Sequence, residues 1–145
     1  MSCTVEKIKP NELKEVAQLL QEAELPYEDI SEHWNNFLVA KIDGKIIGAV
    51  GFELWGNNAL LRSLVVKYEY RNFGVGKELY HRCIELAMKN NIKQIGLLTT
   101  TATGFFAKNG FEKVMGENIP SFIKKTKEFQ VYCPSSSTIM MKEIG

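Results

Sequence analysis

The sequence of 145 residues contains no long hydrophobic run: no stretch approaches the ~18 consecutive apolar residues that cross a bilayer. It also lacks an excess of charge of one sign, because 18 Lys and Arg face 17 Asp and Glu and leave a net charge of +1. No overall field therefore attracts nucleic acid or a membrane surface. The opening segment Met1–Lys7 lacks the apolar core of a secretory signal. We therefore expect neither a membrane nor a nucleic acid as partner.

Cysteine is also scarce. The three residues Cys3, Cys83 and Cys133 are odd in number and far apart, so they cannot all pair, and they show no metal-ligand spacing. We expect a reducing, cytoplasmic compartment and no metal. A chain of this length with 45% hydrophobic residues predicts one domain over 1–145, with a full core.

The first half of the chain predicts an antiparallel meander. Asp43-Gly44 is a strong two-residue hairpin signal, and Gly56-Asn57-Asn58 is a second turn. Apolar residues recur at helical spacing after Pro10. The elements expected here are a strand over 4–9, a helix from 10 to the break at 25–26, a short helix over 27–35, and strands over 37–42, 45–55 and 59–66.

The second half changes pattern. A helix opening at Lys77 is followed by a short buried strand, and strand–helix–strand at this length predicts a crossover between parallel strands. The later elements expected are strands over 95–99, 111–115 and 138–144, a helix over 103–108, and a helical turn within 120–128. The sum is an α/β (α+β) fold: a mixed, mostly antiparallel sheet flanked by helices, with a parallel central strand pair.

The most informative motif is Arg71-Asn72-Phe73-Gly74-Val75-Gly76, between a β-branched strand and a helix. Its glycines let the backbone curl, and N–H groups at a helix N-terminus bind phosphate. We expect a phosphorylated ligand, a diphosphate in chemical class. A turn that only seats the helix is the alternative. A dinucleotide motif lacks its third glycine here, and a P-loop lacks Gly-Lys-Ser/Thr.

The surroundings of this loop resemble a known family. The stretch LRSLVVKYEYRNFGVGKELYHRCIELA resembles motif A of the GNAT superfamily of N-acetyltransferases. The stretch LLTTTATGFFAKNGFEKV resembles that family's fifth strand, fourth helix and following turn. ALLRSLVV and YCPSSSTIMMK look like its arsenic-resistance N-acetyltransferase subgroup, and LLTTTATGFF also resembles amino-acid acetyltransferases of the N-acetylglutamate synthase type.

The resemblance implies a GNAT fold and acetyl transfer from acetyl-CoA to a small amine, an amino acid or an amino-acid-like toxic compound. Arg71 would supply charge and fix the loop, while the pantetheine arm pairs with the strand like an added strand. The cofactor-binding residues implied are Leu64, Val65, Val66, Arg71, Asn72, Phe73, Gly74, Val75, Gly76, Lys77 and Phe106.

The sequence departs from the family at the residues that move protons. Leu60 stands where many members carry a glutamate base, and Phe106 stands where many carry a tyrosine that protonates the thiolate. Glu53 on the neighbouring strand is the substitute base, and Tyr132 and Cys133 are the candidate acids. The alternatives are an exposed strand carboxylate, a packed tyrosine and a buried cysteine.

Substrate contacts are expected from polar side chains near the same strand. By strand alternation Arg62 shares a face with Leu60, and it could hold a substrate carboxylate in a bidentate pair. Ser63 faces the other way, and Thr99 and Thr100 offer hydroxyls. A solvated arginine and ordinary strand propensity for threonine are the alternatives. The pair His33-Trp34 lines the acceptor site or is half-buried packing.

Two other function classes stay open. One is a non-catalytic module that binds acetyl-CoA as a sensor, and the other is a peptide or protein N-acetyltransferase. Within the enzyme reading we expect direct attack by the amine in a ternary complex, because no basic neighbour activates a cysteine for a ping-pong route. A homodimer is a further expectation.

Overall fold

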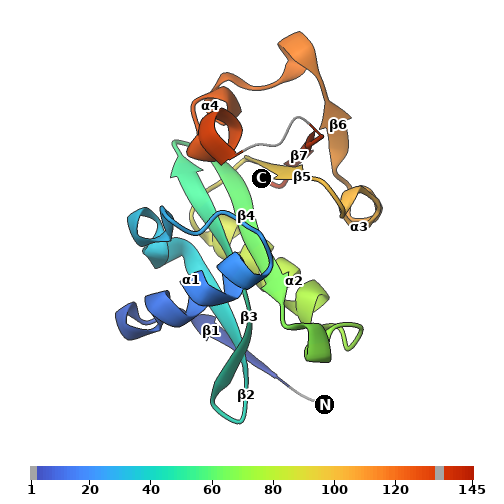
Figure 1. Cartoon of the computed structure of the whole chain (residues 1–145). Helices are drawn as coiled ribbons and strands as arrows, with labels where there is room; N and C mark the ends of the chain where they lie inside the picture. The colour runs from blue at the N-terminus through green and yellow to red at the C-terminus, as the bar shows by residue number, and fades with distance from the viewer. Residues whose placement is uncertain (1–2, 133–135) are drawn as a thin grey trace. The chain divides into compact units, whose positions relative to one another are not determined.

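A computed structural model describes residues 3–132 and 136–145 of the chain. The chain forms two compact units, and Figure 1 labels their helices and strands. The first unit comprises Met1–Glu53 and Leu61–Ala87, and the second comprises Leu54–Leu60 and Met88–Gly145. The expectation of a single domain over 1–145 stays a prediction.

The elements follow the expected order with small shifts at their ends. The strands are β1 (Thr4–Lys7), β2 (Phe37–Ile42), β3 (Lys45–Trp55), β4 (Asn58–Val66), β5 (Gln94–Thr99), β6 (Glu112–Val114) and β7 (Thr138–Glu143). The α-helices are α1 (Leu13–Glu22), α2 (Val75–Lys89), α3 (Thr103–Lys108) and α4 (Ser121–Lys124). Among the described residues, no helix has the length and apolar character that a membrane span requires.

The strands form a seven-stranded sheet in the order β1-β2-β3-β4-β5-β7-β6. β1 pairs with β2 and β2 with β3 in antiparallel fashion. β4 and β5 run parallel, from the pair Asn58 and Gln94 to the pair Leu60 and Gly96. β7 is antiparallel to both of its neighbours. The predicted mixed sheet with one parallel pair is confirmed, because the α2 connection between β4 and β5 is long enough to reverse the chain.

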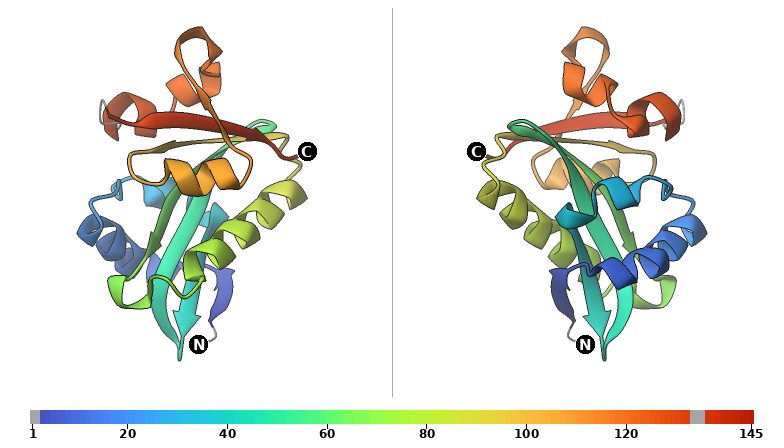
Figure 2. Two further views of the ribbon diagram at one scale, coloured as in Figure 1. Left: turned by 90° about the vertical axis from the view of Figure 1, so that its right-hand side faces the viewer. Right: turned by 90° about the vertical axis from the view of Figure 1, so that its left-hand side faces the viewer.

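Helices cover both faces of the strands in the first unit: α1 and α2 lie on opposite faces (Figure 2). The apolar side of α1 packs into a core with β2 and β3, and Leu79 of α2 approaches the backbone at Gly48 from the other side. The buried members of the α1 core are Ile8, Val16, Leu19, Leu20, Ile30, Phe37, Val39, Ile46, Ala49 and Val65. Burial of both sheet faces explains why β3 is apolar along most of its length.

The second unit has its own core. Phe122 and Ile123 of α4 pack with Leu60 at the start of β4 and with Ile139 of β7. Leu60 is fully buried in this cluster, and this packing explains why the position holds an apolar residue.

The segment after α1 differs from the sequence prediction. A helix over 27–35 was wrong in type: the chain forms two 3-10 turns, Ile30–Glu32 and Trp34–Asn36. Asp29 is buried just before the first turn and His33 lies between the two. Asp29 pairs with Arg62 on β4, and the His33 imidazole lies near Glu53 on β3.

Candidate functional site

The glycine loop connects the end of β4 to α2 within the first unit. Its backbone has left-handed torsion angles at Asn72 (φ 69°) and Gly74 (φ 82°). Asparagine and glycine tolerate this region best, so the loop's sequence fits its curl. Val75 is buried and anchors the first turn of α2, while the residues before it are exposed. The loop therefore presents main-chain N–H groups at a helix N-terminus to solvent.

Arg71 ties this loop to the strand. Its Nε donates a hydrogen bond to the Val66 carbonyl at 3.0 Å, and its guanidinium lies 5.6 Å from the ring centroid of Tyr68. Phe73 and Lys77 are exposed on the same loop and helix start. The structure brings the predicted loop residues together, while their contact with a cofactor stays a prediction.

The packing of the protein does not explain why position 76 holds a glycine. A Cβ built on it would meet only Val66 Cγ2, at an ordinary contact distance of 3.7 Å, and its φ is not left-handed. A Cβ on Gly74 would meet nothing within 4 Å, although its φ of +82° favours glycine. The fold itself would accept a side chain at position 76, so the space over this backbone fits a ligand such as a diphosphate.

β4 carries the strand positions expected to bind the pantetheine arm. Its pairing with β5 ends at Leu60, before Leu64, Val65 and Val66 are reached. Val65 is buried in the first unit's core, whereas Leu64 and Val66 are half-buried. This segment lies between the loop and Arg62 on the same strand.

Three buried charged side chains meet in the first unit. Arg62 on β4 holds Asp29 in a bidentate pair, with both nitrogen–oxygen distances at 2.7 Å. The same guanidinium donates to Glu53 Oε2 on β3 at 2.9 Å. Asp29 and Glu53 are each 2% exposed, and Arg62 is 3% exposed. We call these three residues together with His33 the acidic cluster.

This arrangement changes the expected roles of two residues. The alternatives of an exposed strand carboxylate at Glu53 and a solvated Arg62 are wrong, since both are buried. The bidentate partner of Arg62 is Asp29 of the chain itself, so a substrate carboxylate would have to displace it. The binding of a substrate carboxylate by Arg62 stays a prediction.

Ser63 does not point away from Arg62 as strand alternation predicted. Arg62 Nε donates to Ser63 Oγ at 3.1 Å. The reason is a left-handed backbone angle at Ser63 (φ 63°), which interrupts the alternation of side chains along β4. Such a conformation in a non-glycine strand residue is uncommon and is typical of functional sites.

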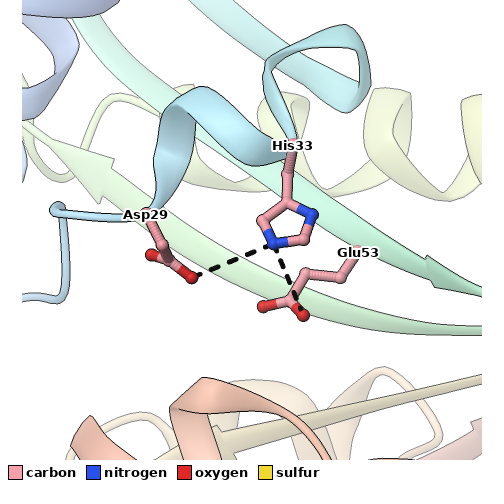
Figure 3. A group of neighbouring side chains, drawn as sticks. All are labelled: Asp29, His33 and Glu53. Carbon is pink, nitrogen blue, oxygen red and sulfur yellow. Dashed lines mark ion pairs between the residues drawn. The ribbon is translucent and has the colours of Figure 1, made fainter.

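His33 lies between the two carboxylates (Figure 3). Its Nε2 is 3.7 Å from Glu53 Oε1 and 3.9 Å from Asp29 Oδ2, and its side chain is 22% exposed. Burial raises the pKa of Asp29, but hydrogen bonds and charge from Arg62 outweigh it and hold that pKa below its ordinary value. The cluster thus combines buried ionised groups with one partly accessible imidazole.

The same side chains satisfy one requirement of a metal site. One ligand atom from each of Asp29, His33 and Glu53 lies within 4.8 Å of the others. Arg62 already donates to both carboxylates, so a divalent cation here would face a positive neighbour and compete for the same oxygen atoms. The donor set therefore suits proton chemistry better than a cation.

The remaining predicted residues belong to the second unit. Thr99 Oγ1 accepts a hydrogen bond from the Ala102 amide at 3.0 Å, and Thr100 is exposed. Phe106 is 4% exposed and packs edge-on against Phe105 and Phe111. Tyr132 is half-buried at the end of the π-helical segment Glu128–Tyr132, and Cys133 lies outside the described residues. Their site roles stay predictions.

Sequence reasoning missed Asp29 altogether. It stands 33 residues from its partner Arg62, and no spacing rule connects two such positions. The one available signal was the density of charged residues near His33, within a segment whose apolar pattern is weak.

Sequence comparisons find relatives among acetyltransferases. The chain is 31% identical over 97 residues to an uncharacterized N-acetyltransferase of Chlorobaculum tepidum, covering 66% of this chain and 62% of the relative. It is 26% identical over 95 residues to an amino-acid acetyltransferase of Aeromonas salmonicida, covering 64% of this chain and 22% of the relative. The chain thus spans less than two thirds of the length of these relatives.

Structural comparison supports the same fold. The N-acetylglutamate synthase of Neisseria gonorrhoeae, solved with coenzyme A and N-acetyl-glutamate, superposes with a TM-score of 0.85 at 18% identity. That match covers 100% of this chain and 36% of the synthase. At this identity the likeness establishes the fold alone. The model of the acetyltransferase (GNAT) family matches residues 7–116, most of the sequence, and the chain belongs to that family.

Proposed function

We propose that the protein is an N-acetyltransferase that transfers the acetyl group of acetyl-CoA to a small amine with amino-acid character. The observation that carries the proposal is the loop from Arg71 to Gly76: an exposed helix N-terminus with unfilled space over Gly76. Membership of the GNAT family and the coenzyme A bound to the Neisseria synthase support acetyl-CoA as the ligand.

The strand beyond the loop gives the cosubstrate a path. From Val66 to Arg62 is four residues, about 13 Å at roughly 3.3 Å per strand residue. An extended pantetheine arm that pairs along β4 from the loop brings its thioester toward Arg62 and Ser63. There the amine nitrogen attacks the thioester carbon, the carbon–sulfur bond breaks, and a main-chain N–H of β4 stabilises the oxyanion.

The environment of Cys83 is consistent with direct attack by the amine. Cys83 on α2 is fully buried, and burial raises the pKa of its thiol to about 12. A thiol held in its protonated form is a poor nucleophile, so Cys83 does not carry an acetyl intermediate. We therefore propose a ternary complex rather than a ping-pong route.

The acceptor class is inferred from charge and from the relatives. The acidic cluster contains two carboxylates that hydrogen-bond one guanidinium. These carboxylates attract a cationic amine. The Aeromonas relative is named an amino-acid acetyltransferase. Amino acids are therefore the first compounds to test, and amino-acid-like toxic compounds, as the likeness to the arsenic-resistance subgroup implies, are the second. Cytoplasmic location and a homodimer stay predictions.

The test has two parts. Calorimetry measures coenzyme A binding to the wild type and to Gly76→Trp, whose indole would fill the phosphate space; we expect binding to be lost with the fold intact. Unchanged affinity in a folded variant would remove the loop from the proposal. Mass spectrometry then follows acetylated product from acetyl-CoA and a panel of amines.

The second candidate function is a non-catalytic sensor of acetyl-CoA. Leu60 and Phe106 favour it, since both are buried apolar residues and neither position can move a proton. Coenzyme A binding with no acetylation of any amine in the panel would support the sensor. Acetylation of a peptide N-terminus but of no free amino acid would support a protein acetyltransferase.

A further inference from the structure

We propose that His33 is the proton acceptor for the attacking amine, with Asp29 and Glu53 as positioning residues that hold its imidazole. This inference rests on the proposed acetyl transfer. It names a base for a chain in which Leu60 stands at the position of the family's glutamate base. In this proposal His33 takes the proton, and Glu53 positions the imidazole and does not act as the base itself.

The carboxylates themselves are poorly placed to take a proton from a substrate. Asp29 has both oxygens on Arg62, and Glu53 has Oε2 on the same guanidinium. Each is 2% exposed, whereas the His33 side chain is 22% exposed. Of these three groups, the imidazole is the one that an amine from solution can reach.

The orientation of the ring fits this division of roles. Nε2 faces both carboxylates, and the second ring nitrogen, Nδ1, points away from them (Figure 3). A carboxylate that accepts from one ring nitrogen leaves the other nitrogen as the base. The separations of 3.7 and 3.9 Å are longer than hydrogen bonds, and catalytic contacts of this kind commonly shorten when substrate binds.

The surrounding charges support a proton on this imidazole during the reaction. The charged groups that face it are Asp29 from the preceding turn, Glu53 from β3 and, behind both, Arg62 from β4. Both carboxylates lie near Nε2, at 3.9 Å for Asp29 and 3.7 Å for Glu53. They therefore stabilise the positive charge that forms on the ring when Nδ1 accepts a proton.

The protons and electrons of the step balance as follows. The ammonium form of the acceptor gives one proton to His33 Nδ1, and the neutral nitrogen uses its lone pair to attack the thioester carbon. The carbon–sulfur bonding pair leaves with the thiolate. The proton that the new amide nitrogen must lose is transferred to the thiolate sulfur, and His33 returns its proton to water. Amide, free thiol and one released proton result.

The chain offers a matched control, because its second and last histidine, His81, is exposed on α2. We expect His33→Gln to lower kcat by about 10²-fold or more, the usual contribution of a general base, with coenzyme A affinity unchanged. His81→Gln should keep wild-type turnover. Imidazole added to His33→Gly should restore part of the rate. Thermal melting checks that each variant is folded.

The pH profile separates a base from a structural residue. In the wild type kcat/KM should fall at acid pH, and His33→Gln should lose that limb while keeping its other pH dependence. Equal turnover of a folded His33→Gln and the wild type would overturn the proposal and leave acetyl transfer standing. Failure of the wild type to acetylate any amine would instead overturn the proposed function and, with it, the role of His33.

A readout without turnover tests the geometry directly. Long-range ¹H–¹⁵N NMR spectra distinguish the two neutral imidazole tautomers, and we expect the Nε2–H form at His33. The Nδ1–H form would overturn the proposal, because Nδ1 could not then accept a proton. Calorimetry with zinc chloride alone is the last arm: tight binding in the wild type that His33→Gln abolishes would overturn the proposal in favour of a metal centre.

Discussion

Replacing Gly76 by alanine should move stability and ligand affinity in opposite directions. The site accepts a methyl group, since the nearest atom to a built Cβ is Val66 Cγ2 at 3.7 Å and the backbone φ is not left-handed. Alanine also restricts the unfolded chain more than glycine does. We expect Gly76→Ala to stabilise the fold by up to about 1 kcal/mol, which raises Tm by roughly 2–4 °C.

The same methyl group should weaken coenzyme A binding. It stands over the main-chain N–H groups that are proposed to hold the diphosphate, and it displaces a phosphate oxygen from one charge-assisted hydrogen bond. At about 1.5–3 kcal/mol for such a bond, the dissociation constant should rise about 10- to 100-fold. Scanning fluorimetry measures Tm and calorimetry measures the affinity.

Gly104 provides the matched control, because it is the second residue of α3 as Gly76 is the second residue of α2. A Cβ on Gly104 would meet nothing within 4 Å. Gly104→Ala should raise stability by a similar amount and leave coenzyme A affinity unchanged. A stable Gly76→Ala variant with wild-type affinity would refute the reasoning that this space is reserved for the ligand.

Three further predictions concern buried ionisable groups. Arg62→Met should cost about 3–5 kcal/mol of unfolding free energy by chemical denaturation, because it leaves two carboxylates buried without their partner; a loss below about 1 kcal/mol would contradict the buried pairing. The pKa of Asp29 is lowered, so its contribution to stability is present above its ordinary pKa and is lost as the pH falls through the lower, folded-state value; unfolding free energy should therefore fall less steeply in acid for Asp29→Asn than for the wild type. Iodoacetamide at pH 8 should modify Cys83 only after denaturation, because a thiol with a pKa of about 12 is almost wholly protonated. Mass spectrometry of peptides measures the modification. Rapid modification of the native protein would show that α2 opens.

Most of the fold follows from local sequence signals. The Asp43-Gly44 turn between apolar runs predicted the β2–β3 hairpin, and both strands have the predicted bounds. The helix predicted over 103–108 also has the predicted bounds. α2 begins at Val75 rather than Lys77, because Gly76 adopts a helical φ that sequence alone does not reveal. Among the described residues, the differences lie at element ends, in short 3-10 turns such as those after α1, and in the π-helical segment Glu128–Tyr132.

The candidate site is harder to predict because its geometry depends on two non-local events. One is the pairing of Asp29, in the segment after α1, with Arg62 on β4. The other is the left-handed angle at Ser63, which sets its hydroxyl beside the Arg62 guanidinium. Period-two reasoning assumes a regular strand, so it fails at this residue.

The composition of the acidic cluster favours a chemical role over a structural one. Burying charged groups costs free energy, and an apolar set of similar volume commonly stabilises a core as well or better. Its two carboxylates hydrogen-bond one guanidinium and also face His33 Nε2. They attract positive charge, either as a proton on the His33 ring or as an approaching ammonium group. Because the carboxylates stabilise both a protonated His33 ring and a nearby ammonium group, the cluster lowers the free energy of the proton transfer that must precede attack on a thioester.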